Sequence, residues 1–127
     1  MRKLLVIAVL ALSACASQEV SRGAVLYADY CAVCHGEQGR GDGPVGAELP
    51  LAPADLGVLS RSNEGVFPRR RVMAKVYGYP GRFEFMPEFS AVFAGPVVMW
   101  KDDTGETSET PRALLDLAGY LETIQQN

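Results

Sequence analysis

Hydrophobic residues recur at helical spacing in three stretches of the chain. The first runs from Ser17 to Cys31, and its apolar positions are Val20, Ala24, Tyr27, Ala28 and Cys31. The second covers residues 68–77, with Pro68 in its first turn, an inward face of Val72, Met73 and Val76, and Gly78 as its end. The third begins at Thr110-Pro111, a helix cap followed by a first-turn proline, and its apolar stripe is Leu114, Leu117, Ala118, Leu121 and Ile124. The pattern therefore predicts three amphipathic helices.

The first and last of these helices are natural packing partners. Gly23 on the first, and Ala118 and Gly119 on the last, are small enough to let two helices approach closely. We predict that the two helices cross at these residues, with Tyr27 and Tyr120 packed at the crossing.

The segments between the helices are rich in residues that break regular structure. Residues 36–57 are dense in Gly and Pro and predict an extended loop with tight turns. Residues 77–93 combine several aromatic residues with Gly78, Pro80 and Gly81, which predicts an aromatic-walled loop. Residues 97–100 are apolar and predict a short strand or extended segment, and the polar, acidic residues 101–110 predict a surface loop. Arg69, Arg70 and Arg71 predict a solvated helix face, with docking to an acidic group as the alternative.

The amino terminus has the layout of an export signal. Arg2 and Lys3 precede an apolar run from Leu4 to Leu12, which is too short to span a bilayer. Leu12-Ser13-Ala14-Cys15 resembles a bacterial lipobox, in which Cys15 would be acylated and hold the protein on a membrane. Cleavage after Ala16, giving a soluble protein, is the alternative. We predict a signal peptide over residues 1–14, a tether over 15–19 and one domain over 20–127.

Cys31, Cys34 and His35 form a C-x-x-C-H motif, which is typical of c-type haem attachment. Two thiols at this spacing can each add to one vinyl group of a porphyrin edge, and the adjacent imidazole can bind the iron. A redox dithiol lacks the βαβ setting that it would need here, and a structural disulfide is a weaker alternative. A structural zinc site needs four Cys or His ligands, but the chain has one His and three Cys. A Ser-His-Asp site would need that same histidine.

Iron held by one imidazole needs a sixth ligand, and a thioether suits electron transfer. Beyond the signal the chain has three methionines, Met73, Met86 and Met99. Met73 lies on the inward face of a predicted helix and Met99 in an apolar run. Met86 lies in the aromatic loop and precedes Pro87, which keeps the loop from becoming helical. We therefore predict Met86 as the sixth ligand, with Met99 and Met73 as alternatives.

Three further residues are candidate cofactor contacts. The carbonyl of Pro44 could accept the Nδ1 proton of His35, although Pro44 could equally be only a turn residue. Tyr79 lies in the aromatic loop that contains Met86. Trp100 is more often a core residue, but its indole N–H could donate to a haem propionate.

Size and charge narrow the range of functions. The 127 residues form one small domain whose own core is limited, so a large apolar cofactor would supply much of its interior. Signal cleavage would remove Arg2 and Lys3 but no acidic residue, which takes the formal net charge from −3 to −5. So acidic a chain is not expected to bind nucleic acid.

Taken together, these motifs resemble the class I cytochrome c family. The resemblance covers nearly all of the chain beyond the signal and rests on the following segments: Gly23-x-x-x-Tyr27-x-x-x-Cys31, the C-x-x-C-H motif, Gly41-Asp42-Gly43-Pro44, Met86-Pro87-Glu88-Phe89 and Leu117-x-x-Tyr120-Leu121. Tyr27 stands where many members have phenylalanine. The resemblance implies an all-α fold of three to five helices around one covalent haem c, with crossing N- and C-terminal helices and with His35 and Met86 as axial ligands.

The resemblance also implies a function. We expect a monomeric one-electron carrier, not an enzyme, which exchanges electrons with redox protein partners on the periplasmic side of a membrane. The absence of Asp after Cys15 favours the outer membrane. One alternative is a haem subunit docked in a dehydrogenase or oxidase complex. The other is a ligand-binding or peroxidatic haem protein, for which the sequence offers no distal acid or second histidine.

Overall fold

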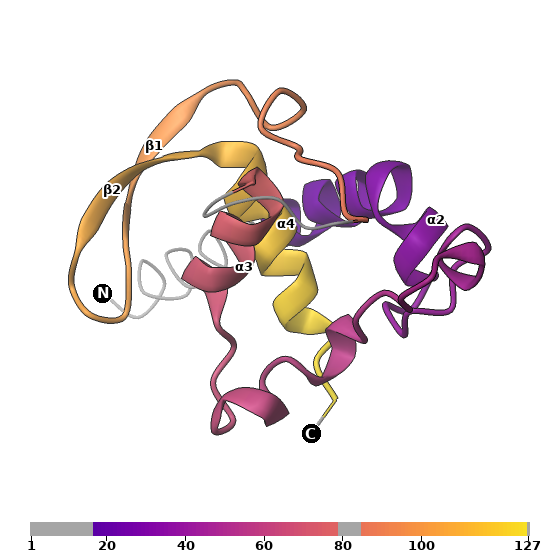
Figure 1. The fold of residues 1–127 in the computed structure, drawn as a ribbon. Coiled ribbons are helices and arrows are strands. Elements are labelled where there is room, and N and C mark those ends of the chain that lie inside the picture. The colour runs from indigo at the N-terminus through magenta and orange to yellow at the C-terminus, as the bar shows by residue number, and fades with distance from the viewer. Residues whose placement is uncertain (1–16, 79–84, 127) are drawn as a thin grey trace, which may run out of the picture.

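A computed structural model describes residues 17–78 and 85–126 of the chain (Figure 1). The predicted signal peptide, Cys15, Tyr79 and part of the aromatic loop lie outside these residues. Residues 17–19, the end of the predicted tether, are the first residues of the helix that the sequence predicts from Ser17.

The described residues are mostly helical, as the sequence predicts. The N-terminal helix covers residues 17–30 and is followed by α2 (Ala32–His35), α3 (Arg69–Tyr77) and α4 (Arg112–Thr123). Three short 3₁₀ turns lie between α2 and α3, at Gly46–Glu48, Leu56–Val58 and Arg61–Asn63. Helix α3 ends at Gly78, whose φ of 96° is easily adopted only without a side chain. No helix of the described residues is both long and apolar enough to cross a bilayer.

The N-terminal helix and α4 cross as predicted. A Cβ atom added to Gly23 would lie 2.0 Å from the backbone oxygen of Asp116 and 2.7 Å from Tyr120 Cβ, so only glycine allows this approach. The Tyr27 and Tyr120 rings pack at the crossing with their centroids 5.3 Å apart. Arg22 adds a two-pronged ion pair to Asp116, with Nε 2.6 Å from Oδ2 and Nη2 2.8 Å from Oδ1.

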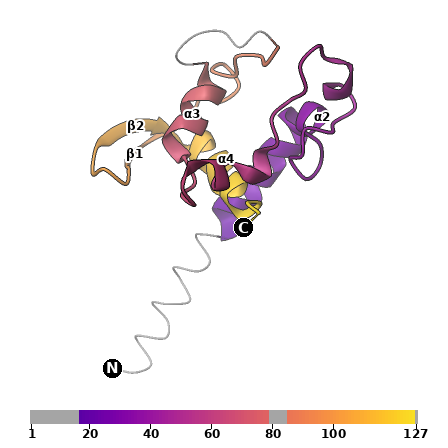
Figure 2. The same cartoon turned by 60° about the horizontal axis from the view of Figure 1, so that its bottom comes forward.

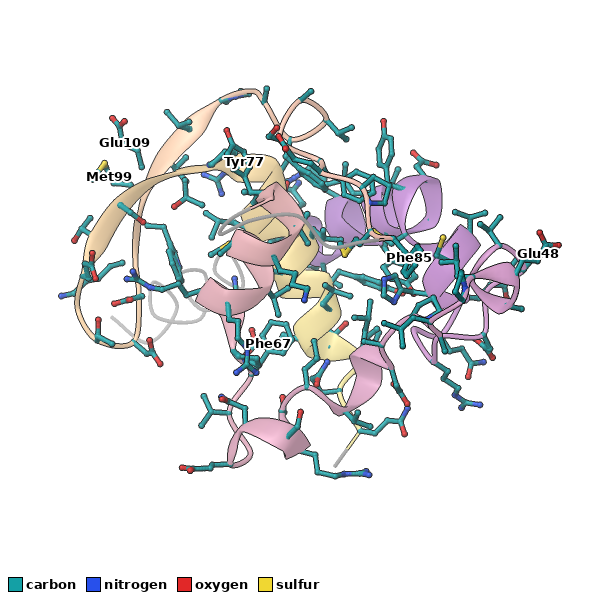
Figure 3. All side chains as sticks on the ribbon, in the orientation of Figure 1. Glu48, Phe67, Tyr77, Phe85, Met99 and Glu109 are labelled. Atoms are coloured by element: carbon teal, nitrogen blue, oxygen red, sulfur yellow. The ribbon has the colours of Figure 1, made fainter. Side chains whose placement is uncertain are left out.

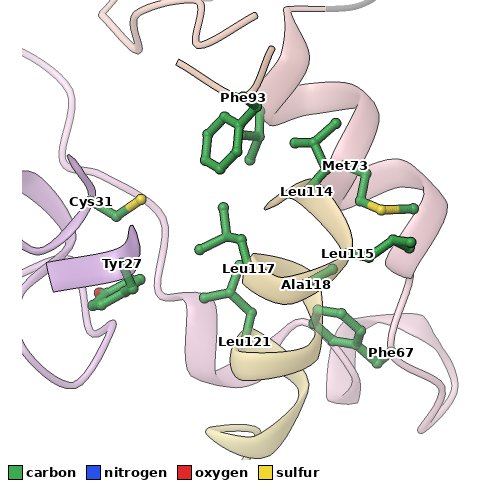
Figure 4. Close-up of a cluster of buried hydrophobic side chains, with 11 residues drawn as sticks. Tyr27, Cys31, Phe67, Met73, Phe93, Leu114, Leu115, Leu117, Ala118 and Leu121 are labelled. Carbon is green, nitrogen blue, oxygen red and sulfur yellow. The ribbon is translucent and has the colours of Figure 1, made fainter. Parts of the chain in front are cut away.

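The hydrophobic core surrounds α4 (Figure 4). Its three most enclosed large side chains are Tyr27, Phe93 and Leu117. Met73 and Val76 contribute the inward face of α3, as predicted, and Cys31 enters the same cluster from the haem motif. One core therefore links the N-terminal helix, α3 and α4, and it connects the motif to the rest of the fold.

One β-hairpin is added to the helical fold. Strand β1 (Val97–Lys101) pairs antiparallel with β2 (Thr107–Pro111), and Met99 lies opposite Glu109. The prediction of a surface loop over 101–110 is therefore wrong for its second half. The turn is ordered by Asp102, whose carboxylate accepts hydrogen bonds from the backbone amides of Thr104 and Glu106, at 3.0 and 2.8 Å, and from the Thr104 hydroxyl.

The hairpin also moves the start of the last helix. Pro111 ends β2 and precedes α4, which begins at Arg112, so the prediction of Thr110 as the helix cap is wrong by one residue. In the two views of Figures 1 and 2 the hairpin and α2 lie on opposite sides of α4. This separation decides which residues can reach the C-x-x-C-H motif.

Candidate haem-binding site

The C-x-x-C-H motif continues the N-terminal helix through one irregular turn. The Cys31 amide donates to the carbonyl of Tyr27 at 2.9 Å, and the His35 amide donates to the carbonyl of Cys31, also at 2.9 Å. Cys31 is buried, and Cys34 is half-buried. Burial, with Cys34 nearby, raises the pKa of the Cys31 thiol to about 11. The two cysteines are not joined to each other as a disulfide.

The loop after the motif is held against it by backbone hydrogen bonds. The amides of Gly41 and Gly43 donate to the carbonyls of His35 and Cys34, at 2.8 and 3.1 Å. A Cβ atom on Gly43 would lie 2.6 Å from the Cys34 carbonyl, so this contact requires glycine. The Tyr27 hydroxyl donates to the Gly36 carbonyl at 2.5 Å. The glycine-rich loop therefore packs closely against the C-x-x-C-H motif and holds it in place.

The orientation of His35 is set by a backbone carbonyl. Its Nδ1 lies 3.0 Å from the oxygen of Ala54. Because a carbonyl can only accept, Nδ1 carries the proton, and Nε2 is left with the lone pair that binds a metal. Burial lowers the pKa of His35, while the Ala54 carbonyl opposes this shift. The hydrogen bond to Ala54 thus selects the tautomer in which Nε2 is the ligand atom.

This contact corrects one prediction. Sequence reasoning placed the carbonyl of Pro44 beside His35 Nδ1, but the structure places that of Ala54 there. Residues 36–57 do form the predicted loop, and the way this loop folds back explains why Ala54 and not Pro44 reaches His35. The chain turns back through Gly41 and Gly46 and brings Pro53 and Ala54 against the motif: a Cβ on Gly41 would lie 2.4 Å from the Pro53 oxygen. A carbonyl leaves no side-chain signal in the sequence, so Ala54 was missed.

A cavity of about 520 Å³ opens beside the motif. Cys31, Cys34 and His35 line it, and so does Met86, which arrives from the loop after α3. The lining is mostly apolar, and its other members are as follows: Asp29, Tyr30, Val33, Leu49, Leu51, Ala52, Pro53, Ala54, Lys75, Phe85, Pro87 and Phe89. Phe85, one of these residues, is labelled in Figure 3. The volume is in the range of cofactor sites.

Only one of the three candidate methionines lies at this cavity. Met73 is 6% exposed within the core, and Met99 is 65% exposed on β1, where Figure 3 shows it at the hairpin. Met86 is half-buried and contacts the edge of the core. The structure therefore brings together Cys31, Cys34, His35 and Met86, four of the residues that the sequence singled out.

Trp100 does not belong to this group. It lies on β1 opposite Ser108 and packs against the core, whereas the cavity lining does not include it. The structure therefore does not bring Trp100 to the cavity, because pairing with β2 holds it in the hairpin on the other side of α4. Two charged residues at the cavity, Asp29 and Lys75, were not singled out from the sequence, where they look like ordinary helix-surface residues.

The side chains at the cavity fit a covalently attached haem. Two thiols lie on one wall, the adjacent imidazole has Nε2 free of its proton, and a thioether lies in the same mostly apolar space. Among the described residues, no group of three or more His, Cys, Asp or Glu side chains is placed to hold a metal ion directly. Cys31 and Cys34 would hold the porphyrin, and His35 and Met86 would bind its iron.

Comparison with known protein families supports this assignment. The family model described as "Cytochrome c" matches residues 20–124, and the chain belongs to the cytochrome c family. Comparisons with curated proteins and with solved structures found no match. The family implies a haem-based electron carrier with covalent haem c and redox protein partners, and its members are typically carriers, not enzymes.

Proposed function

We propose that this protein is a one-electron carrier with a single haem c whose iron is ligated by His35 and Met86. One observation carries the proposal: of the three methionines, only Met86 lines the cavity that also contains the C-x-x-C-H motif. When bound, haem supplies an iron that cycles between Fe(II) and Fe(III).

The chain's own residues favour rapid electron exchange by limiting movement. The Ala54 carbonyl keeps the Nδ1 proton on His35, so the ligand nitrogen retains its lone pair in both oxidation states. Cys31 is packed within the hydrophobic core, which fixes the position of the C-x-x-C-H motif. The aromatic residues Phe85 and Phe89 and the aliphatic residues Leu49 and Leu51 give the cavity an apolar lining, which has few dipoles to reorient. Few groups therefore need to reorganise when the charge changes.

The mouth of the cavity suits brief contacts with a redox partner. Val33, Leu51 and Phe85 line the cavity and are also 47, 69 and 39% exposed. A small apolar contact of this kind can form and separate quickly, and the acidic chain would favour a partner with a basic docking surface. A stable complex with a dehydrogenase or oxidase is the alternative to such a diffusing carrier.

Replacing each methionine by leucine tests the ligand assignment. We expect Met86→Leu to abolish the weak red absorption band that a ferric sulfur–iron bond gives, and to lower the midpoint potential, because a thioether favours Fe(II). Met99→Leu and Met73→Leu are matched controls, since they conserve volume and lie at the hairpin and in the core. An unchanged band in Met86→Leu, or a lost band in either control, would refute the assignment.

We further propose that the protein is exported and anchored to a membrane through acylated Cys15. The support is sequence alone: the charged and apolar segments before Cys15 and the small residues next to it. Mass spectrometry of protein from a bacterial host that matures c-type cytochromes should show one haem and two or three acyl chains. Cys15→Ser should then release the protein from the membrane fraction. A mature chain that begins at Ser17 without lipid would exclude the anchor.

A further inference from the structure

We propose that Gln125, in the chain after α4, is a positioning residue for His35. The side-chain amide of Gln125 reaches across to the segment that follows Ala54. Its Nε2 donates to the Leu56 carbonyl at 2.7 Å, and its Oε1 accepts from the Ser60 amide at 2.9 Å. Gln125 thus ties the C-terminal end of the chain to the loop that carries the carbonyl partner of His35. This inference rests on the proposed role of His35 as an iron ligand.

The hydrogen-bond partners of Gln125 leave one orientation for its amide group. Nε2 also donates to the Leu121 carbonyl, at 2.8 Å, so two carbonyls lie at the nitrogen and one backbone N–H lies at the oxygen. Exchanging the oxygen and nitrogen would set acceptor against acceptor and donor against donor. The bond to Leu121 also holds the side chain to α4, which is anchored in the core. Gln125 therefore connects the loop at Leu56 and Ser60 to α4, so the loop is held in a fixed position relative to the core.

The segment that Gln125 holds follows directly on the exposed stretch that contains Ala54. Residues 52–55 have no regular secondary structure, and Ala54 itself is exposed. On one side, the Leu56 amide donates to the Gly39 carbonyl at 2.6 Å, which fixes the segment to the loop after the motif. On the other side, Gln125 holds Leu56 and Ser60. Ala54 lies two residues before Leu56, so the position of its carbonyl depends on these attachments, to which the Gln126 amide adds a hydrogen bond to the Gly57 carbonyl.

Movement of this carbonyl would change the electronic character of His35. A strong hydrogen bond from Nδ1–H increases the basicity of the imidazole, and a more basic ligand stabilises Fe(III) relative to Fe(II). Loosening the loop lengthens this bond on average and makes His35 a weaker donor. The midpoint potential should therefore rise when Gln125 is truncated, although Gln125 is not among the residues that line the cavity.

Gln126 provides a matched control one residue further along. It also contacts the same loop, but through its backbone amide, which donates to the Gly57 carbonyl at 2.7 Å. Truncation of the Gln126 side chain leaves that amide in place. The pair Gln125→Ala and Gln126→Ala therefore separates the loss of a side-chain attachment from the general effect of truncating the C-terminal tail.

The experiment uses the haem-loaded full-length protein with Gln125→Ala, Gln125→Glu and Gln126→Ala. Two quantities are measured: the midpoint potential, and the hydrogen-exchange rate of the His35 Nδ1 proton in the reduced protein by NMR. Gln125→Ala should raise the potential and speed exchange roughly tenfold or more, since both hydrogen bonds to the loop are lost. Gln125→Glu keeps the acceptor for Ser60 and loses the donor to Leu56, so it should shift both quantities in the same direction. Gln126→Ala should match the wild type.

The outcomes separate this inference from the proposed function. A wild-type protein without a low-spin haem spectrum would overturn both. A normal wild-type spectrum, with potential and exchange unchanged in Gln125→Ala and Gln125→Glu, would overturn only the positioning role. Equal shifts in Gln125→Ala and Gln126→Ala would also overturn it, because they would point to a general loosening of the tail. A loss of stability in Gln125→Ala without a change in potential would show that the residue is merely structural.

Discussion

The crossing of the N-terminal helix and α4 can be tested by adding one methyl group. In Gly23→Ala the new Cβ would lie 2.0 Å from the Asp116 carbonyl oxygen, which belongs to the backbone of a core helix and cannot rotate away. Ordinary carbon–oxygen contacts are about 3.3 Å or longer, so the helices must separate by roughly 1 Å. Overpacking of this kind costs about 1–3 kcal/mol, and the better helix propensity of alanine returns about 0.5–1 kcal/mol. We expect a net loss of about 1 kcal/mol in the free energy of unfolding.

Gly119→Ala is the matched control at the same crossing. Its Cβ would lie 2.4 Å from Glu19 Oε1, the far end of a flexible side chain that can swing toward solvent. The lost contact of Glu19 with Arg69 is a partly exposed ion pair and costs at most about 1 kcal/mol, which the helix propensity of alanine offsets. Denaturant unfolding of the haem-loaded variants, followed by circular dichroism, gives both values. Equal stability of Gly23→Ala and wild type, or equal losses in the two variants, would refute the close-crossing argument.

The other predictions concern charges and the hairpin. The Thr104 hydroxyl, followed by Arg70, lowers the pKa of Asp102 to about 2, so this carboxylate stabilises the protein above about pH 4 and loses its effect as the pH falls toward 2. Acid unfolding of Asp102→Asn should therefore depend less on pH over that range, and an unaltered profile would contradict the assignment. Arg22→Met should destabilise more than Asp116→Asn in denaturant titration, because only the first leaves the buried Asp116 carboxylate unpaired. Trp100→Phe should leave the visible spectrum and midpoint potential unchanged, and a shift in either would return Trp100 to the cofactor site.

The main helices could be predicted because local chemistry and packing agree in them. Gly23, Tyr27 and Tyr120 indicated the crossing from size and helical spacing alone, and the structure confirms it. The end of α3 at Gly78 was predicted for a similar reason, since a left-handed residue there favours glycine. The helices and their ends depend on residues a few positions apart in the chain, so they can be predicted from the sequence alone.

The hairpin and the support of His35 could not be predicted in this way. Strand β2 is polar and looks like a loop until β1 lies beside it, and that pairing moves Trp100 away from the haem motif. The partner of His35 is the carbonyl of Ala54, a group that every residue possesses. Its selection depends on how residues 36–57 fold back, and Gln125 joins that arrangement from the other end of the chain.

The sequence by itself determined the chemistry of this protein: the thiols and imidazole for haem attachment, the three methionines from which a sixth ligand can come, and the helices that carry or frame them. Side-chain type and near-neighbour spacing are sufficient for these. The sequence favoured Met86 among these methionines, but only the tertiary structure brought it into one cavity with the motif and decided which backbone oxygen orients the histidine. Both depend on contacts between distant segments, and the free energy that selects those contacts comes from packing the whole core.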